Sequence, residues 1–207
     1  MRIILASQSP ARRELMKKLS QKMGFHVKFQ TSDYPEDMRA YKQAWRLAEH
    51  LALGKARHLA TQLAKKFPSA IIIGADTFIT CGRDKHGQKK IGKPTSIADA
   101  KRIIRSMSGK IIGVYSGLAV VSTDTRGDIV QEEVTYALTR LWVKRMNSEE
   151  VDRLAHQKNA LKISGAFSIE GEGGKMITRI DGDYDNVIGL PIFILEAILT
   201  RYGMRSV

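Results

Sequence analysis

The fold of this chain is decided by the stretch Ile3-Ile4-Leu5-Ala6-Ser7-Gln8-Ser9-Pro10-Ala11-Arg12-Arg13-Glu14-Leu15-Met16-Lys17-Lys18-Leu19. Its apolar beginning predicts a short strand over residues 2–6, and the helical spacing of apolar residues from Ala11 onward predicts a helix directly after it. Ser9 suits the N-cap of this helix, and Pro10 suits its first position, where a missing N–H costs nothing. The stretch therefore predicts a strand, a tight turn and a well-marked helix start.

The turn before this helix gathers groups that bind anions. Free N–H groups and the positive end of the helix dipole would lie beside the hydroxyls of Ser7 and Ser9. The guanidinium groups of Arg12 and Arg13 follow in the first turn of the helix. Together these groups favour a phosphate ligand. The alternative is that Ser9 only caps a surface helix with solvated arginines, an arrangement that is common in proteins.

Length and composition limit the class of protein. The 207 residues, of which 43% are hydrophobic and 27% charged, suffice for one core or for one core with a small lobe, so we expect a single domain over residues 1–207. No apolar run approaches the roughly 20 residues of a membrane span, and the first apolar run is too short for a signal peptide. We expect a cytoplasmic protein without a membrane partner. Cys81, the single cysteine, excludes an internal disulfide and is expected to be an inert strand residue.

The net charge of +13 is concentrated in the first third of the chain. Residues 1–66 hold 14 basic against 5 acidic side chains, whereas residues 67–207 hold 20 against 16. Such a bias fits a polyanionic partner, either nucleic acid or a small phosphorylated ligand. Aromatic residues do not interleave with the basic ones, and no zinc-finger, RNP or basic-zipper pattern occurs. A phosphorylated small molecule is therefore favoured.

Strands and helices are expected to alternate along the rest of the chain. Gly54 lies inside the second expected helix and would bend it or allow close packing. A polar hairpin tip is expected over residues 81–90, and a turn over residues 181–186. Hydrophobic periodicity predicts strands over residues 25–30, 69–79, 111–122, 129–143 and 177–180, and helices over residues 39–66, between residues 95 and 109, from residue 147 and from residue 192.

Two acidic positions are candidates for chemistry. Asp76 directly follows the residues 70–75, which are apolar on both faces and predict a central buried strand. A carboxylate at the end of such a strand must be paired, hydrogen-bonded, bound to metal or protonated, because an isolated buried charge is costly. Glu36 belongs to the acidic cluster of the loop 31–37, for which a solvated turn is the alternative to a metal site. Lys55 would be solvated on the polar side of its helix unless a ligand lies nearby.

Four pairs of short motifs follow one another along the chain. They are Ile4-Leu5-Ala6-Ser7-Gln8-Ser9-Pro10 with Arg12-Arg13-Glu14-Leu15, Arg46-Leu47-Ala48 with Lys55-Ala56, Gly74-Ala75-Asp76-Thr77 with Gly92-Lys93-Pro94, and Gly165-Ala166-Phe167 with Ile188-Gly189-Leu190-Pro191. Each motif is short, but jointly they resemble the Maf (septum formation protein) family of nucleoside triphosphate pyrophosphatases over nearly the whole chain.

The resemblance implies a fold and an activity. The fold would be the α/β fold of the inosine triphosphate pyrophosphatases, an elongated mixed β-sheet flanked by helices with a cleft between two lobes. The activity would be hydrolysis of a nucleoside triphosphate to the monophosphate and pyrophosphate with a divalent cation, Mg²⁺ or Mn²⁺. Such chemistry needs cations around the leaving pyrophosphate and a carboxylate that holds metal or orients water.

The resemblance also implies roles for individual residues. By motif position, Asp76 would be the catalytic carboxylate and, together with Glu36, a ligand of the metal. The phosphates would be bound by Ser7, Ser9, Arg12, Arg13, Lys55 and Lys93.

Thr77 and Glu170 bear on the base of the substrate. Where many family members have a glutamine, this chain has Glu170 before Gly171, which resembles the branch that prefers 7-methylguanosine triphosphate. An ionised carboxylate accepts N–H donors of a guanine-type ring and can face a cationic methylated ring. Thr77 instead resembles the branch that acts on dTTP and UTP, which is therefore the alternative.

Two other classes of function stay open at this point. A non-catalytic nucleotide sensor would share the phosphate site, although it would gain nothing from Asp76. A nucleic-acid-binding protein would show an affinity for DNA or RNA that falls steeply with salt. We expect a nucleoside triphosphate as the partner and no stable nucleic-acid binding, and we leave a homodimer open.

Overall fold

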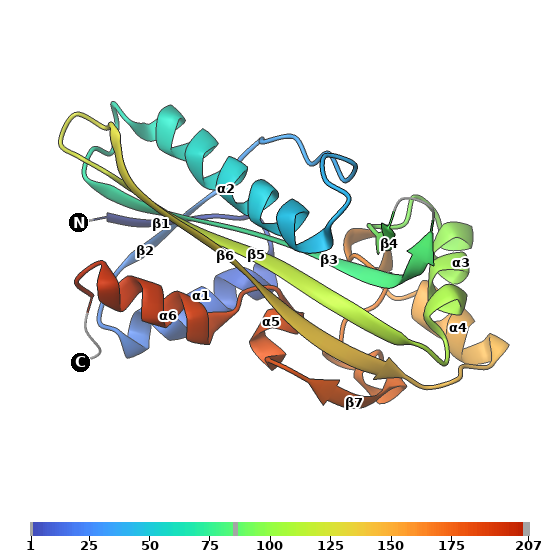
Figure 1. Ribbon diagram of the computed structural model, residues 1–207. Coiled ribbons are helices and arrows are strands. Elements are labelled where there is room, and N and C mark those ends of the chain that lie inside the picture. The colour runs from blue at the N-terminus through green and yellow to red at the C-terminus, as the bar shows by residue number, and fades with distance from the viewer. Residues whose placement is uncertain (1, 85–86, 205–207) are drawn as a thin grey trace.

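The computed structural model describes residues 2–84 and 87–204, and within them seven strands form one mixed sheet (Figure 1). The strand order is β2-β1-β3-β5-β6-β7, and β4 pairs with β3 on the same edge as β1. The strands are β1 (Arg2–Ala6), β2 (Val27–Gln30), β3 (Ala70–Asp84), β4 (Gly87–Ile91), β5 (Ile111–Thr123), β6 (Ile129–Val143) and β7 (Ile177–Asp181). The helices are α1 (Pro10–Lys22), α2 (Ala44–Leu63), α3 (Ile97–Met107), α4 (Ser148–Ala155), α5 (Tyr184–Ile188) and α6 (Ile192–Arg201), with the 3-10 turns η1 (Ala160–Lys162) and η2 (Gly174–Met176).

The strand, turn and helix predicted from the first stretch are confirmed. β1 lies between β2 and β3 and runs parallel to both. The side chain of Ser9 accepts a hydrogen bond from the N–H of Arg12 at 3.4 Å and caps α1, whose first residue is Pro10. The N-terminus of α1 therefore follows directly beyond the carboxyl end of a parallel strand.

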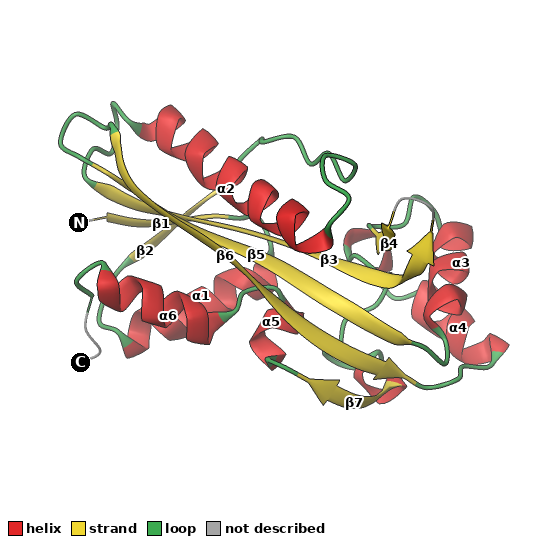
Figure 2. Cartoon of the chain, in the orientation of Figure 1, coloured by secondary structure: helices red, strands yellow, loops and turns green. Residues whose placement is uncertain are grey.

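Helices cover both faces of the sheet at the end where β1 and β2 lie (Figure 2). α2 lies on one face, where its apolar side packs against Ile4 and Ile72. α1 and α6 lie on the other face and pack against Ile3 and Ile73. Successive side chains of a strand point to opposite faces, so β1 and β3 are buried on both sides at this end of the sheet, as the apolar residues 70–75 predicted for β3.

The long strands β3, β5 and β6 continue beyond these helices to a second apolar cluster (Figure 1). There α3 and α4 pack with Ile79, Ile112 and Leu141 of the sheet. Cys81 is buried in the same cluster, and its burial raises the pKa of the thiol. A thiol with a raised pKa is a poor nucleophile, in agreement with an inert strand residue.

Helix α2 approaches the sheet closely at Gly117 of β5. A Cβ atom at this position would lie 1.8 Å from the carbonyl oxygen of Ala48. Ala48 and Ala52 present only methyl groups to the sheet, and both are fully buried. Because Gly117 is paired with Asp76 across β3 and β5, this close approach also sets how near α2 lies to Asp76.

Helix α2 and strand β3 differ in length from the sequence-based prediction. α2 begins at Ala44 rather than near residue 39, because the preceding residues lie on the hairpin of β3 and β4. There the ammonium of Lys90 contacts the carbonyl oxygens of Met38, at 3.2 Å, and Tyr41. β3 continues to Asp84 because it pairs with β4, and residues 85 and 86 of the expected hairpin tip lie outside the described residues.

The turn predicted over residues 181–186 contains the start of a short helix instead. Asp183 caps α5, since its side chain accepts a hydrogen bond from the N–H of Asp185 at 2.9 Å. A polar sequence with aspartates fits both a turn and a helix start, and here the capping bond decides for the helix.

The predicted fold class, an elongated mixed β-sheet flanked by helices, is confirmed. In residues 2–84 and 87–204, no helix has both the length and the apolar character that crossing a bilayer requires. The expected single domain over residues 1–207 stays a prediction.

Gly117→Ala is expected to lower the free energy of unfolding by about 1–3 kcal/mol, because the added methyl group would overpack against the backbone of α2. Urea denaturation followed by circular dichroism measures the change. Gly92→Ala is the control, since a Cβ atom at Gly92 would meet no atom within 4 Å. Equal unfolding midpoints for the two variants would contradict the close approach of α2.

Candidate functional site

One edge of β3 has no neighbouring strand over a short distance. β1 pairs with β3 as far as Gly74, and β4 joins the same edge only at Ile79. In the part of the chain that the structure describes, residues 75–78 therefore have no strand on this side, and we call them the open edge of β3. In sheets with parallel strands, ligands bind beyond the carboxyl ends of the strands, where neighbouring strands part.

The turn between β1 and α1 brings two hydroxyls to the start of α1. The Oγ of Ser7 accepts a hydrogen bond from the N–H of Ser9 at 3.2 Å. Ser7 is buried, whereas Ser9 is half-buried and caps the helix. Arg13 points back to this turn, because its Nε donates to the carbonyl oxygen of Ser7 at 3.0 Å. These three predicted phosphate ligands are therefore held together at one helix N-terminus.

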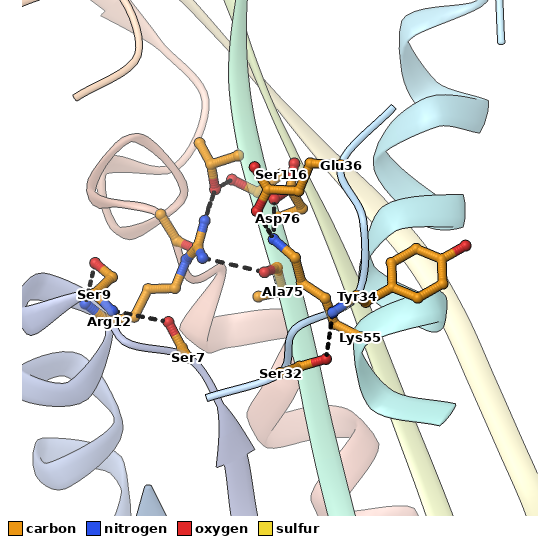
Figure 3. A network of polar contacts seen from close by, with 12 residues as sticks. Ser7, Ser9, Arg12, Ser32, Tyr34, Glu36, Lys55, Ala75, Asp76 and Ser116 are labelled. Carbon is orange, nitrogen blue, oxygen red and sulfur yellow. Dashed lines mark hydrogen bonds and ion pairs between the residues drawn. The ribbon is translucent and has the colours of Figure 1, made fainter. Parts of the chain in front are cut away.

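Arg12 connects α1 to the open edge and to the residue that follows α5 (Figure 3). Its Nε donates to the carbonyl oxygen of Gly189 at 2.7 Å, and its Nη1 donates to the carbonyl oxygen of Ala75 at 3.1 Å. Its Nη2 donates to Thr77 Oγ1 at 2.9 Å. Burial lowers the pKa of Arg12, while nearby carboxylates oppose this effect. Three of the five N–H groups of this predicted phosphate ligand are thus used within the protein.

Lys55 of α2 joins the two carboxylates that were predicted as metal ligands (Figure 3). Its ammonium lies 2.5 Å from Glu36 Oε1 and also contacts Asp76 Oδ1. Lys55 and Asp76 are each 6% exposed, whereas the side chain of Glu36 is 48% exposed. Removal of one partner from a buried pair leaves an uncompensated charge, so Lys55 and Asp76 depend on each other.

Glu36 reaches this site on the segment 31–43, which runs from β2 to α2. Tyr34 of this segment lies against α2 at Gly54, where a Cβ atom would be 2.2 Å from its ring. Gly54 was expected to bend the helix or to allow close packing, and close packing is confirmed. Burial raises the pKa of Glu36, but the hydrogen bond and the charge of Lys55, helped by other nearby cations, outweigh burial and hold this pKa below its usual value.

Thr77 lies in a polar network on the face of the sheet opposite to Asp76. Its Oγ1 is 2.8 Å from Ser116 Oγ and 3.2 Å from the carbonyl oxygen of Gly189. Ser116 donates to the backbone oxygen of Asn186 at 3.1 Å, and both residues are fully buried. Sequence reasoning missed Ser116 and Asn186. For Ser116 a signal existed, because a hydroxyl inside an apolar strand must find a partner.

Two of the predicted site residues, Lys93 and Glu170, lie outside these networks. Lys93 is exposed in the connection between β4 and α3, near enough for its charge to help lower the pKa of Glu36. Glu170 is exposed in the glycine-dense loop after η1. This loop touches the connection before α3, because the N–H of Gly165 donates to the carbonyl oxygen of Gly92 at 3.2 Å. A ligand would have to reach from the open edge to this loop to contact Glu170.

The two carboxylates fit a hard divalent cation. Asp76 and Glu36 converge on one positive charge, the ammonium of Lys55. Mg²⁺ is commonly bound by one or two carboxylates, and water and substrate phosphates fill its other positions. Among residues 2–84 and 87–204, no group of three or more His, Cys, Asp and Glu side chains is arranged to hold a metal ion. A cation at this place would therefore be completed by its ligand rather than by further protein side chains.

The fold and the site define a mixed α/β protein in which a helix N-terminus, a buried ion pair and the open edge of a central strand meet in one place. The chain belongs to the Maf family, since the family model described as Maf-like protein matches residues 2–202. The resemblance inferred from the sequence motifs is thereby confirmed.

Similar proteins carry two names. A protein of Moorella thermoacetica named dTTP/UTP pyrophosphatase is 35% identical over 98% of this chain and 96% of its own length. A protein of Alkaliphilus oremlandii with the same name is 34% identical over 97% of this chain and 95% of its own. A protein of Syntrophotalea carbinolica named 7-methyl-GTP pyrophosphatase is also 34% identical, over 98% of this chain and 95% of its own. Sequence identity alone does not separate the two names.

Solved structures with a related arrangement are more distant. The Ham1 protein of Staphylococcus aureus matches 98% of this chain and 100% of its own, with a TM-score of 0.47 and 12% identity. A nucleoside-triphosphatase, also named dITP/XTP pyrophosphatase, of Mycobacterium abscessus matches 72% of this chain and 75% of its own, with a TM-score of 0.41 and 16% identity. Likeness at this level indicates no activity for this chain.

Arg12→Lys is expected to lower the free energy of unfolding by about 1–3 kcal/mol, because one ammonium does not reach the three acceptors of the guanidinium and leaves carbonyl groups unpaired. Urea denaturation measures the loss. Arg13→Lys is the matched control, since Arg13 donates only to Ser7 among the described residues, and its loss should be clearly smaller. An equal loss in the two variants would show that Arg12 does not hold the site together.

Proposed function

We propose that this protein is a nucleoside triphosphate pyrophosphatase, which hydrolyses a nucleoside triphosphate to the monophosphate and pyrophosphate with a divalent cation. The observation that carries the proposal is the buried pair of Lys55 and Asp76, with Glu36 beside it, at the open edge of β3. Burial of the two charges of Lys55 and Asp76 costs free energy, and so does the placement of two carboxylates close together. A purely structural site would not need either feature. The names of the similar proteins support the same class of reaction.

The phosphates would be bound at the N-terminus of α1. The hydroxyls of Ser7 and Ser9 and the remaining donors of Arg12 and Arg13 are gathered there, next to the positive end of the helix dipole. Lys93 would add positive charge from the connection between β4 and α3. Such cations stabilise the negative charge that develops on the leaving pyrophosphate.

The carboxylates would act on the other side of the polyphosphate. Asp76 and Glu36 would hold the cation, Mg²⁺ or Mn²⁺, which when bound polarises phosphoryl oxygen and neutralises charge. Asp76 would also orient the attacking water. The water oxygen would bond to one of the two phosphorus atoms of the α,β-bridge as the bond between that phosphorus and the bridging oxygen breaks, and the proton of the water would pass to solvent. Lys55 compensates the buried charge of Asp76 before the ligand and the cation bring their own charges.

For the base, we propose a guanine-type ring such as 7-methylguanine. Glu170 supports this choice, because an exposed carboxylate in the loop next to Gly92 can accept N–H donors from a ring that extends from the open edge. The alternative is a substrate of the dTTP and UTP type, which Thr77 and the names of most of the similar proteins favour.

Asp76→Asn should reduce pyrophosphate release by roughly 10²–10⁴-fold, the usual contribution of a positioned acid–base or metal-holding group. Colorimetric detection of pyrophosphate measures turnover, calorimetry measures nucleotide binding, and circular dichroism checks the fold. Asp128→Asn, on an exposed turn with 71% of its side chain accessible, is the control and should leave turnover unchanged. Near wild-type turnover of Asp76→Asn would remove Asp76 from the catalytic role.

The base preference is measured as the ratio of kcat/KM for 7-methyl-GTP to kcat/KM for dTTP. An ionised Glu170 facing the O4 carbonyl of thymine would leave two acceptors without a proton, which disfavours dTTP by roughly 10- to 100-fold. Glu170→Gln should narrow this gap, whereas Glu172→Gln in the same loop should leave it unchanged. If the wild type prefers dTTP or UTP, the guanine proposal is wrong and the pyrophosphatase proposal still stands.

A further inference from the structure

A cavity of about 610 Å³ lies beyond the first turn of α2. Its walls come from residues 42–45, from the hairpin of β3 and β4, and from the neighbouring ends of β5 and β6. The N-terminal end of α2 points toward this hairpin in Figure 1. The volume lies within the usual range for sites that bind small molecules.

This cavity is separate from the open edge of β3. Thr80 lines the cavity and points to the same face of β3 as Asp76, but Phe78 stands between them. Phe78 is buried, stacks on Tyr115 with ring centroids 6.1 Å apart, and packs with Leu47 of α2. A ligand in the cavity would therefore touch neither the ion pair nor the turn before α1.

Three cationic side chains line the cavity, Lys42, Arg83 and Arg140, and no acidic side chain among the described residues lines it with them. Arg140 lies 3.6 Å from Asp181 in an exposed pair, which contributes little. Among the side chains that the structure describes, which do not include that of Asp84, none makes a hydrogen bond or an ion pair with the side chain of Lys42 or Arg83. A cluster of cationic side chains without an acidic side chain among the described lining residues attracts a polyanion such as a phosphate ester.

The cavity also has an aromatic side. Trp45 lines it, is 37% exposed, and is supported by Tyr136, whose ring centroid lies 5.9 Å away in a stacked arrangement. Tyr115 adds a second ring that is largely buried, at 7% exposed, and Gln88 donates to its hydroxyl at 3.1 Å. An exposed and supported aromatic ring such as that of Trp45 stacks with the planar rings of nucleobases, and amide and hydroxyl groups bind their edges.

We propose that this cavity is a second binding site, for a nucleoside phosphate, with the phosphates facing Lys42, Arg83 and Arg140 and the base on the aromatic side. The site does not rest on the activity proposed above, because it is built from different residues. It is linked to the open edge through the segment 31–43, which carries Glu36 as well as Lys42. A ligand held by Lys42 would restrain the segment that brings Glu36 to the ion pair.

A fluorescence titration tests the proposal with α,β-methylene-ADP, whose bridging carbon prevents cleavage between the α- and β-phosphorus atoms. The chain has two tryptophans, so Trp142→Phe leaves Trp45 as the only tryptophan reporter. The emission of Trp45 should change with the probe in a saturable way, and the apparent Kd should rise with salt.

Charge-reversal variants show whether the change in Trp45 emission comes from binding in the cavity. In the Trp142→Phe protein, Arg83→Glu with Arg140→Glu should weaken binding of the probe by about tenfold or more, because two charge-assisted contacts to phosphate are lost. Lys158→Glu with Arg126→Glu changes the net charge equally at exposed positions outside the cavity and should leave the Kd unchanged. Lys42→Gln is a milder second variant, which should weaken binding in the same direction even if charge reversal disturbs folding.

The variant Arg13→Ala distinguishes binding in the cavity from binding at the open edge, because Arg13 belongs only to the open-edge site. The change in Trp45 emission should persist in this variant. The proposal is overturned if Trp45 does not respond, if both double variants weaken binding equally, or if the response is lost with Arg13→Ala. Sedimentation velocity tests whether a second copy of the chain, rather than a nucleotide, occupies the cavity. If the cavity substitutions abolish self-association of the chain and leave probe binding unchanged, the cavity is an interface between copies and the proposal is wrong.

Discussion

A buried ammonium needs an anionic partner, and this requirement at Lys55 holds together the parts of the molecule around the site. Lys55 belongs to α2, Asp76 to β3, and Glu36 to the segment that crosses from β2 to α2. The close contact of α2 with Gly117 allows the ammonium to reach Asp76, because a larger residue there would hold the helix away from the sheet. Packing and charge thus act on the same distance, the one between α2 and β3.

The charges around this pair are divided between two sides. Two carboxylates share one ammonium on the side of α2, and oxygen ligands of this kind suit a divalent cation. Arginines and hydroxyls gather at the start of α1, which suits an anion. The metal–polyphosphate complex that we propose as the ligand would present both charges and match this division, whereas a bare anion or a bare cation would match only half of it.

Sequence patterns predicted the local features of the site and missed those that depend on distant partners. The cap at Ser9 was predictable because its donor, the N–H of Arg12, lies within the same helix turn. The need of Asp76 for a partner was also predictable, since it follows an apolar run. Its expected place at the end of the strand was wrong, because β3 continues through Asp76 to Asp84 by pairing with β5 and β4. Arg12 and Arg13 look alike in the sequence. Only Arg12 donates to a distant segment, since its acceptor on Gly189 lies 177 residues away along the chain, and no local pattern shows that contact. The residues just before α2 likewise have a distant partner, because the ammonium of Lys90 on β4 contacts the carbonyl oxygens of Met38 and Tyr41.

The short length of the open edge of β3 has a consequence for solubility. Unpaired strand edges invite strands of other chains, and proteins usually protect them with charge or by covering them. Here the opening extends only from the last partner on β1 to the first on β4, and Arg12 already occupies the carbonyl oxygen of Ala75. A foreign strand would need a longer row of free backbone groups to form a stable ladder. The opening therefore leaves room for a small ligand without offering a template for aggregation.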